Sequence, residues 1–123
     1  ICSLTDSHST DRPMDVHEHL PLAPRDLLIL AVLAEGPSHG YGLIKAVEER
    51  SESGVLLDPA NLYRVLRRMR ELGWIAEADG DDGSRRRVHR IPERGRSLLA
   101  AELGRLERLL DQARPALADG RPA

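Results

Sequence analysis

The chain has 123 residues, of which 41% are hydrophobic and 31% charged, and its formal net charge is −2. This length and composition are typical of one small globular domain, whose limited core is often completed by dimerisation. The single cysteine excludes a disulfide framework and a cysteine-based metal cluster, and no apolar run reaches the roughly 18–20 residues of a membrane span, so we expect a cytoplasmic protein with no membrane partner.

The N-terminal segment, residues 1–22, is polar and is predicted to be a disordered or loosely docked arm. The sequence does not open on methionine, and Met14 is a candidate for the natural start. A helix is predicted over residues 24–35, because Pro24 suits a first helical turn and Asp26 suits the positive end of the helix dipole. This helix is apolar on every side, so it is expected to be buried or to lie in a dimer interface.

Two further helices are predicted in the first part of the chain. One covers residues 39–51, with Ser38 as its cap. The other begins at Asp58-Pro59, a capping residue followed by proline at the first helical position, and it ends before Gly73. Its apolar residues recur at helical spacing and define one buried face: Leu62, Val65, Leu66, Met69 and Leu72.

A hairpin and a long helix complete the predicted elements. Two short strands are expected over residues 74–78 and 85–91, because the turn between them is rich in glycine and aspartate. The last helix is predicted over residues 92–118 and carries a heptad-type seam, which indicates dimerisation, although the seam packing against its own domain is an alternative. The expected dimer contacts are Leu99, Leu103, Leu106, Leu110, Ala113 and Leu117.

This order of elements is that of a winged helix-turn-helix. We therefore predict a mainly α fold, in which three helices and a two-stranded β wing are followed by a C-terminal dimerisation helix. The expected divisions are an N-terminal arm at residues 1–22, a winged-helix domain at 23–91, a dimerisation helix at 92–118 and a tail at 119–123.

The third predicted helix has an outward face suited to double-stranded DNA. Residues 59–96 contain ten arginines against six carboxylates, although the whole chain is acidic. Arginine forks onto guanine or phosphate and asparagine pairs with adenine, so this face is expected to bind DNA. The alternative is a solvated arginine face on an ordinary helix. The residues concerned are Ala60, Asn61, Tyr63, Arg64 and Arg67.

The turn of the predicted hairpin carries a second basic cluster. A wing that lies along a duplex needs cations for phosphate or minor-groove contacts. The predicted contacts here are Ser84, Arg85, Arg86 and Arg87. The alternative is local pairing of these arginines with Asp79, Asp81 and Asp82.

The segments LAEGPSHGYGLIKAVEERS, PANLYRVLRRMRELGWI and GSRRRVHRIPERGRSLL resemble the PadR-like family of transcriptional regulators, over about residues 24–110. The resemblance implies a homodimeric winged-helix repressor, whose third helix and wing bind a palindromic operator. It places Tyr63 near DNA, and Arg68, which belongs to the same motif, joins the predicted DNA contacts. The most specific matches are the His39-Gly40-Tyr41 turn, the Leu62-Tyr63 pair with Leu66 and Arg68, and Gly73.

The chain departs from the family pattern at a few positions. Arg64 stands where the family usually has proline, and Ala60 stands where glycine is usual. The Ile91-Pro92 pair replaces Leu-Thr before the last helix, and Gly42 replaces an acidic residue. None of these changes is expected to break the fold, but Arg64 is expected to alter operator choice.

No catalytic set, phosphate loop or ligand spacing points to an enzyme, a cofactor or a metal site. Trp74 is a candidate for an effector pocket that takes a small molecule, and a buried strand tryptophan is the alternative. A different class of function is also kept open: a winged-helix module that binds protein rather than DNA, which the net charge of −2 favours.

Overall fold

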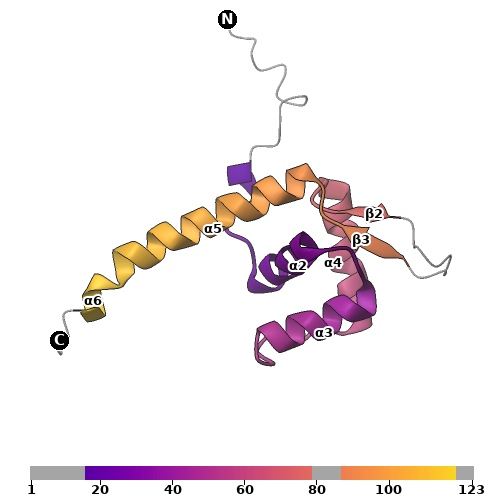
Figure 1. Cartoon of the computed structure of the whole chain (residues 1–123), viewed down its shortest axis with the longest axis horizontal. Helices are drawn as coiled ribbons and strands as arrows, with labels where there is room; N and C mark the ends of the chain where they lie inside the picture. The colour runs from indigo at the N-terminus through magenta and orange to yellow at the C-terminus, as the bar shows by residue number, and fades with distance from the viewer. Residues whose placement is uncertain (1–15, 79–86, 119–123) are drawn as a thin grey trace, which may run out of the picture.

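The computed structural model describes residues 16–78 and 87–118, and its helices and strands form a winged helix-turn-helix (Figure 1). The mainly helical fold predicted from the sequence is confirmed. The elements in chain order are η2 (Val16–His19), α2 (Pro24–Glu35), β1 (Ser38–His39), α3 (Gly40–Arg50), α4 (Pro59–Leu72), β2 (Ala76–Ala78), β3 (Val88–Arg90), α5 (Glu93–Ala113) and α6 (Pro115–Ala118).

The sheet has three antiparallel strands in the order β1-β3-β2, one more than the predicted hairpin. His89 on the central strand pairs with Ser38 on one side and with Glu77 on the other. The wing strands are also shorter than predicted. Trp74 is not in a strand, because its backbone N–H donates to Met69 O at 2.9 Å and closes the end of α4.

Local capping signals fix the ends of α4 as predicted. The Asp58 side chain accepts a hydrogen bond from the Asn61 backbone N–H, and Gly73 ends the helix with a left-handed φ of 82°. The predicted cap of α3 is wrong. Ser38 lies in β1, where its hydroxyl donates to His39 O at 3.0 Å, and His39 precedes the helix without a side-chain cap.

The core is built from aliphatic side chains of α2, α3, α4 and the start of α5, together with Trp74. The end of the predicted N-terminal arm joins it: Leu22 is buried, and its backbone N–H donates to the buried carboxylate of Glu102 at 3.0 Å. The short helix η2 packs on α5 as well. Residues 16–22 are therefore held against α5, which differs from a loosely docked arm.

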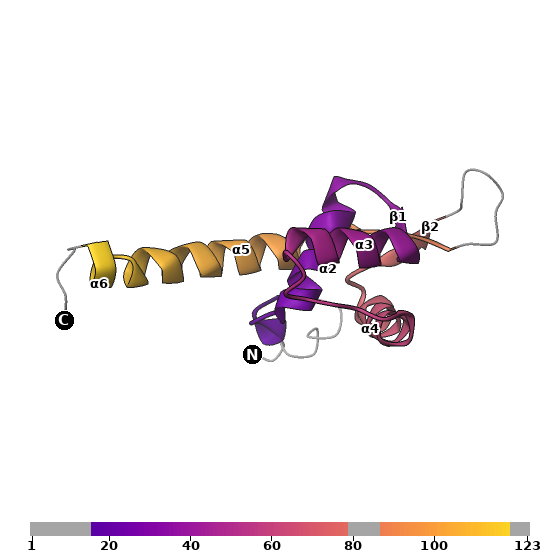
Figure 2. The same cartoon turned by 90° about the horizontal axis from the view of Figure 1, so that it is seen from below.

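Helix α5 extends well beyond the core, with α6 at its far end (Figure 2). The predicted single helix over residues 92–118 is interrupted, because Pro115 has no N–H to donate to the preceding turn. Leu99 is buried within its own chain, which favours for this residue the alternative of packing within the domain. Further along, Leu103, Leu110 and Leu117 are exposed.

Within the ranges that the structure describes, none of the helices combines the length and the apolar character needed to cross a membrane.

Candidate nucleic-acid interface

Helix α4 has one buried face and one open face, because its apolar residues recur at helical spacing. Leu62, Val65, Leu66 and Met69 are buried against the core. On the open side, Tyr63 is 69% exposed, and Ala60, Arg64 and Arg67 are also exposed. These four predicted DNA contacts are therefore accessible to a large partner such as a DNA duplex.

Near the start of α4, Asn61 and Arg64 belong to a network of hydrogen bonds. The Asn61 amide donates to Asp58 Oδ2 at 3.2 Å, and Arg64 donates in turn to the Asn61 carbonyl oxygen. Asn61 must give up these partners before it can pair with a base. Arg67, by contrast, forms no ion pair with any other described residue, so its guanidinium is available without such an exchange.

Arg68, also a predicted DNA contact, has partners on α2 and next to α4. Its guanidinium lies 5.2 Å from the centroid of the Trp74 ring and 3.5 Å from the carboxylate of Asp26. Asp26 is 5% exposed, so Arg68 neutralises a buried charge of α2. Arg68 therefore has partners within the fold, while its side chain remains 56% exposed, and its contact with DNA stays a prediction.

Of the predicted wing contacts, Arg87 lies among the described residues. Arg87 pairs with Glu77 of β2, at 2.9 Å between Nη1 and Oε2. Arg70 of α4 approaches the same carboxylate oxygen at 3.9 Å. The remaining predicted wing contacts, Ser84, Arg85 and Arg86, lie outside the described residues, as do Asp79, Asp81 and Asp82.

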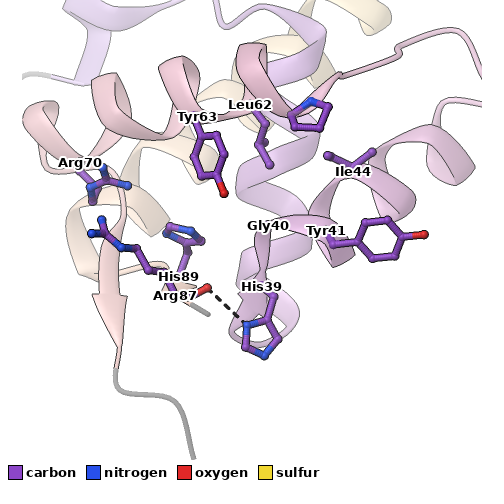
Figure 3. A pocket seen from close by; sticks show the side chains of 10 residues that line it. His39, Gly40, Tyr41, Ile44, Leu62, Tyr63, Arg70, Arg87 and His89 are labelled. Atoms are coloured by element: carbon purple, nitrogen blue, oxygen red, sulfur yellow. Dashed lines mark hydrogen bonds between the residues drawn. The ribbon is translucent and has the colours of Figure 1, made fainter. Parts of the chain in front are cut away.

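A pocket of about 690 Å³ lies between α3, α4 and β3, beside the open face of α4. Figure 3 shows Tyr63 and Arg70 pointing from α4 toward Arg87 and His89. His89 is 3% exposed, and its Nδ1 has no hydrogen-bond partner among the described residues. Burial, together with the positive charge of Arg70, lowers the pKa of the His89 imidazole below its usual value of 6.5.

His39 closes the pocket at the start of α3, where its Nδ1 lies 3.4 Å from Arg87 O. Nothing in spacing or composition singles out Arg70 or His89. They come together only in the fold, where β2 and β1 flank β3 and α4 contributes Arg70 to the pocket that His89 lines. The His39-Gly40-Tyr41 motif was the one local signal at this place.

Trp74 lies in the core and does not line the pocket. It is 1% exposed, with Arg68 over its ring and His19 against its edge at 5.3 Å between ring centroids. Its Nε1 has no hydrogen-bond partner in the described part of the chain. These contacts favour the alternative in which Trp74 is a buried packing residue, although Trp74 precedes β2 and is not in a strand.

The chemistry of this surface is that of binding. Arginines and tyrosines provide donors for phosphates and base edges. Among residues 16–78 and 87–118 there is no group of three or more His, Cys, Asp or Glu side chains that could hold a metal ion.

The chain matches the model of the transcriptional regulator PadR-like family over residues 29–101. It is also 34% identical over 83 residues to an uncharacterized 37.1 kDa protein in a transposon of Streptomyces fradiae. That alignment covers 68% of this chain and 23% of the relative, so the chain spans about a quarter of the length of this curated relative.

Solved structures show the same fold. A transcriptional regulator from Clostridium thermocellum is similar with a TM-score of 0.63 and 24% identity, over 74% of this chain and 87% of that one. A PadR family transcription regulator from Clostridium difficile has a TM-score of 0.59 and 21% identity, over 73% of this chain and 97% of that one. Bacillus subtilis PadR, solved in complex with operator DNA, has a TM-score of 0.58 and 19% identity, over 68% of this chain and 47% of that one.

Proposed function

Because the chain belongs to the PadR-like family of transcriptional regulators, we propose that it is a repressor that binds a pseudo-palindromic operator as a homodimer. The observation that carries this proposal is the open face of α4, where Tyr63, Arg64 and Arg67 are exposed beside one another. The operator complex of Bacillus subtilis PadR, which has the same fold, supports it. In this proposal residues 23–91 bind DNA, and residues 92–118 provide the dimer contacts.

The exposed leucines of α5 support the homodimer. Leu103 is 46% exposed and Leu110 49%, and the two lie seven residues apart on one side of α5, while Leu117, which is 85% exposed, follows in α6. A stripe of this length is a liability on a monomer. A second copy of the chain, presenting the same stripe, buries it by the symmetric pairing that is commonest in homodimers.

DNA binding is tested by fluorescence anisotropy on the DNA upstream of the chain's own gene, beside a scrambled duplex, at two salt concentrations. We expect the native fragment to bind more tightly, with an affinity that falls steeply as salt rises, because bound arginines release counterions from phosphates. Equal binding of the two duplexes at both salt concentrations argues against a specific regulator of this DNA. It favours the other class of function, a winged-helix module for a protein partner.

Two neighbouring arginines of α4 provide a matched pair of variants. Arg67→Ala should weaken operator binding at least about fivefold and leave unfolding unchanged. Arg68→Ala should instead lower the stability of the fold, because it removes a partner of buried Asp26 and the cation over Trp74. Anisotropy and thermal unfolding separate the two effects. If Arg67→Ala binds the operator like the wild type, this face of α4 is not the DNA contact.

The dimer is tested with the double variant Leu103→Asp/Leu110→Asp. It should be monomeric by analytical ultracentrifugation, because two carboxylates in each copy would be buried without partners. Ser97→Asp/Gln112→Asp adds the same charge at exposed positions outside the stripe, and this control should remain dimeric. A dimer that survives both double substitutions would refute the α5 stripe as the interface.

A further inference from the structure

The pocket between α3, α4 and β3 has the donors of an anion site. We propose that it binds a phosphate-type oxyanion through Arg70 and Arg87, and that Glu77 occupies this cationic wall while the site is empty. The source of the oxyanion is either the DNA backbone or a free phosphate. The first of these rests on the proposed function, and the second does not.

The cationic wall is formed by two arginines that share one acceptor. Glu77 Oε2 lies 2.9 Å from Arg87 Nη1 and 3.9 Å from Arg70 Nε. Two guanidinium groups that converge on a single carboxylate oxygen leave most of their donors unused, whereas a phosphate offers enough oxygens for both. The side chains of Glu77 and Arg87 are 40% and 66% exposed, so their ion pair is weak and exchange for another anion costs little.

The floor of the pocket contains an unpaired buried nitrogen. Ser38, His89 and Glu77 form one row across the three strands, so their side chains share a face of the sheet, and Arg87 is two residues from His89. His89 is 3% exposed and lacks a partner for Nδ1 within the described residues. A buried nitrogen without a partner requires an explanation, and an anion in the pocket that His89 lines is a candidate acceptor when Nδ1 carries the proton.

The charged and titratable groups around His89 come from every neighbouring element. Arg70 of α4, Arg87 beside β3 and His39 of β1 disfavour the protonated imidazole, while Glu77 of β2 favours it. An oxyanion bound between the two arginines offsets their charge, so it should raise the pKa of His89. The state of this ring therefore reports whether the pocket is filled.

The place of the pocket determines which phosphate can enter it. Tyr63 lines the pocket and also belongs to the open face of α4 (Figure 3). A duplex with α4 in its major groove therefore has its backbone close to this opening, and the Tyr63 hydroxyl adds a further donor. The fit is for one phosphate group beside the bases that α4 contacts.

The first arm of the test measures DNA affinity. Glu77→Gln should bind the operator about two- to fivefold more tightly, because Arg70 and Arg87 no longer need to leave a carboxylate. Arg87→Gln should bind more weakly, with the salt slope reduced by about one. Glu71→Gln is the matched control, since it removes the same charge from an exposed residue of α4 that does not line the pocket.

The second arm uses inorganic phosphate without DNA. Phosphate, compared with chloride at equal ionic strength, should shift the imidazole NMR signals of His89 and raise its pKa, and Arg87→Gln should abolish the shift. Tighter DNA binding by Glu77→Gln without a phosphate shift assigns the site to the DNA backbone. A phosphate shift with no change in DNA affinity assigns it to a free anion.

The inference is overturned if Glu77→Gln binds DNA like Glu71→Gln and phosphate leaves His89 unchanged. This failure is distinct from failure of the proposed function. Arg67→Ala would still weaken operator binding, because Arg67 does not line the pocket.

Discussion

Replacing Glu102 with alanine should lower the free energy of unfolding by about 2 kcal/mol or more, because the substitution leaves a buried backbone N–H without an acceptor. Glu102 is 1% exposed and accepts hydrogen bonds from Leu22 N at 3.0 Å and from Arg105 at 2.6 and 2.8 Å. The unpaired Leu22 N–H alone costs about 1–3 kcal/mol, and loss of the ion pair adds to it.

The assay is urea and thermal unfolding followed by circular dichroism at one protomer concentration. A loss of about 2 kcal/mol corresponds to a fall in Tm of roughly 8 °C for a chain of this size. Glu107→Ala, at an exposed position of the same helix, should change stability by less than about 0.5 kcal/mol. If Glu102→Ala unfolds like Glu107→Ala, the contact between residues 16–22 and α5 contributes nothing to stability.

The pH dependence gives an independent check on Glu102. The hydrogen bonds from Arg105 lower its pKa below the usual value of 4.5, so the carboxylate stabilises the fold above that pH. This contribution is lost as the pH falls through the folded-state pKa. Glu102→Gln keeps an acceptor for Leu22 N but does not titrate, so its stability should fall less steeply in acid than that of the wild type.

Two further predictions concern α5 and the wing. A Cβ at Gly95 would lie 1.9 Å from the carbonyl oxygen of Trp74, so Gly95→Ala should cost at least about 3 kcal/mol in unfolding by urea. At Gly104 a Cβ would lie 3.6 Å from Arg108 Nη1, an ordinary contact, so Gly104→Ala should stabilise α5 by about 0.5–1 kcal/mol. Equal effects of the two substitutions would contradict the close approach of α5 to Trp74. The lowered pKa of His89 means that the unfolded chain binds its proton more readily, so stability should fall as the pH drops below about 6.5. His89→Phe should reduce this fall in urea titrations at pH 7.5 and 5.5, whereas His39→Gln should not, and an unaltered fall in His89→Phe would refute the assignment.

The helix boundaries that were predicted well depend on short-range chemistry. Asp58 caps α4 through a residue three positions away, and Gly73 ends it by its own backbone conformation. Proline at the first position of α2 acts in the same local way. These signals are complete within a few residues, so the sequence alone contains them.

The features that the sequence did not reveal depend on contacts between distant residues. Ser38 has the chemistry of a cap, but pairing of β1 with β3 places it in a strand. Arg68 looks like its neighbour Arg67 in the sequence, yet in the fold it also contacts buried Asp26 and Trp74. The seam of α5 likewise divides at Leu99, because only the start of the helix packs on the domain. Periodicity identifies a face of a helix but not what covers it.

Helix α5 is continuous from the buried Leu98 to the exposed Leu110, which makes it a stiff rod with two different ends. Its 21 residues span about 31 Å. In the proposed dimer, a change of about 10° in the angle between the two α5 helices would displace each DNA-binding domain by roughly 5 Å. The spacing between operator half-sites is about 34 Å, so this displacement is a sizeable part of it. In that dimer, the crossing angle of α5 would therefore set which operator spacing is accepted, far from the residues proposed to contact bases.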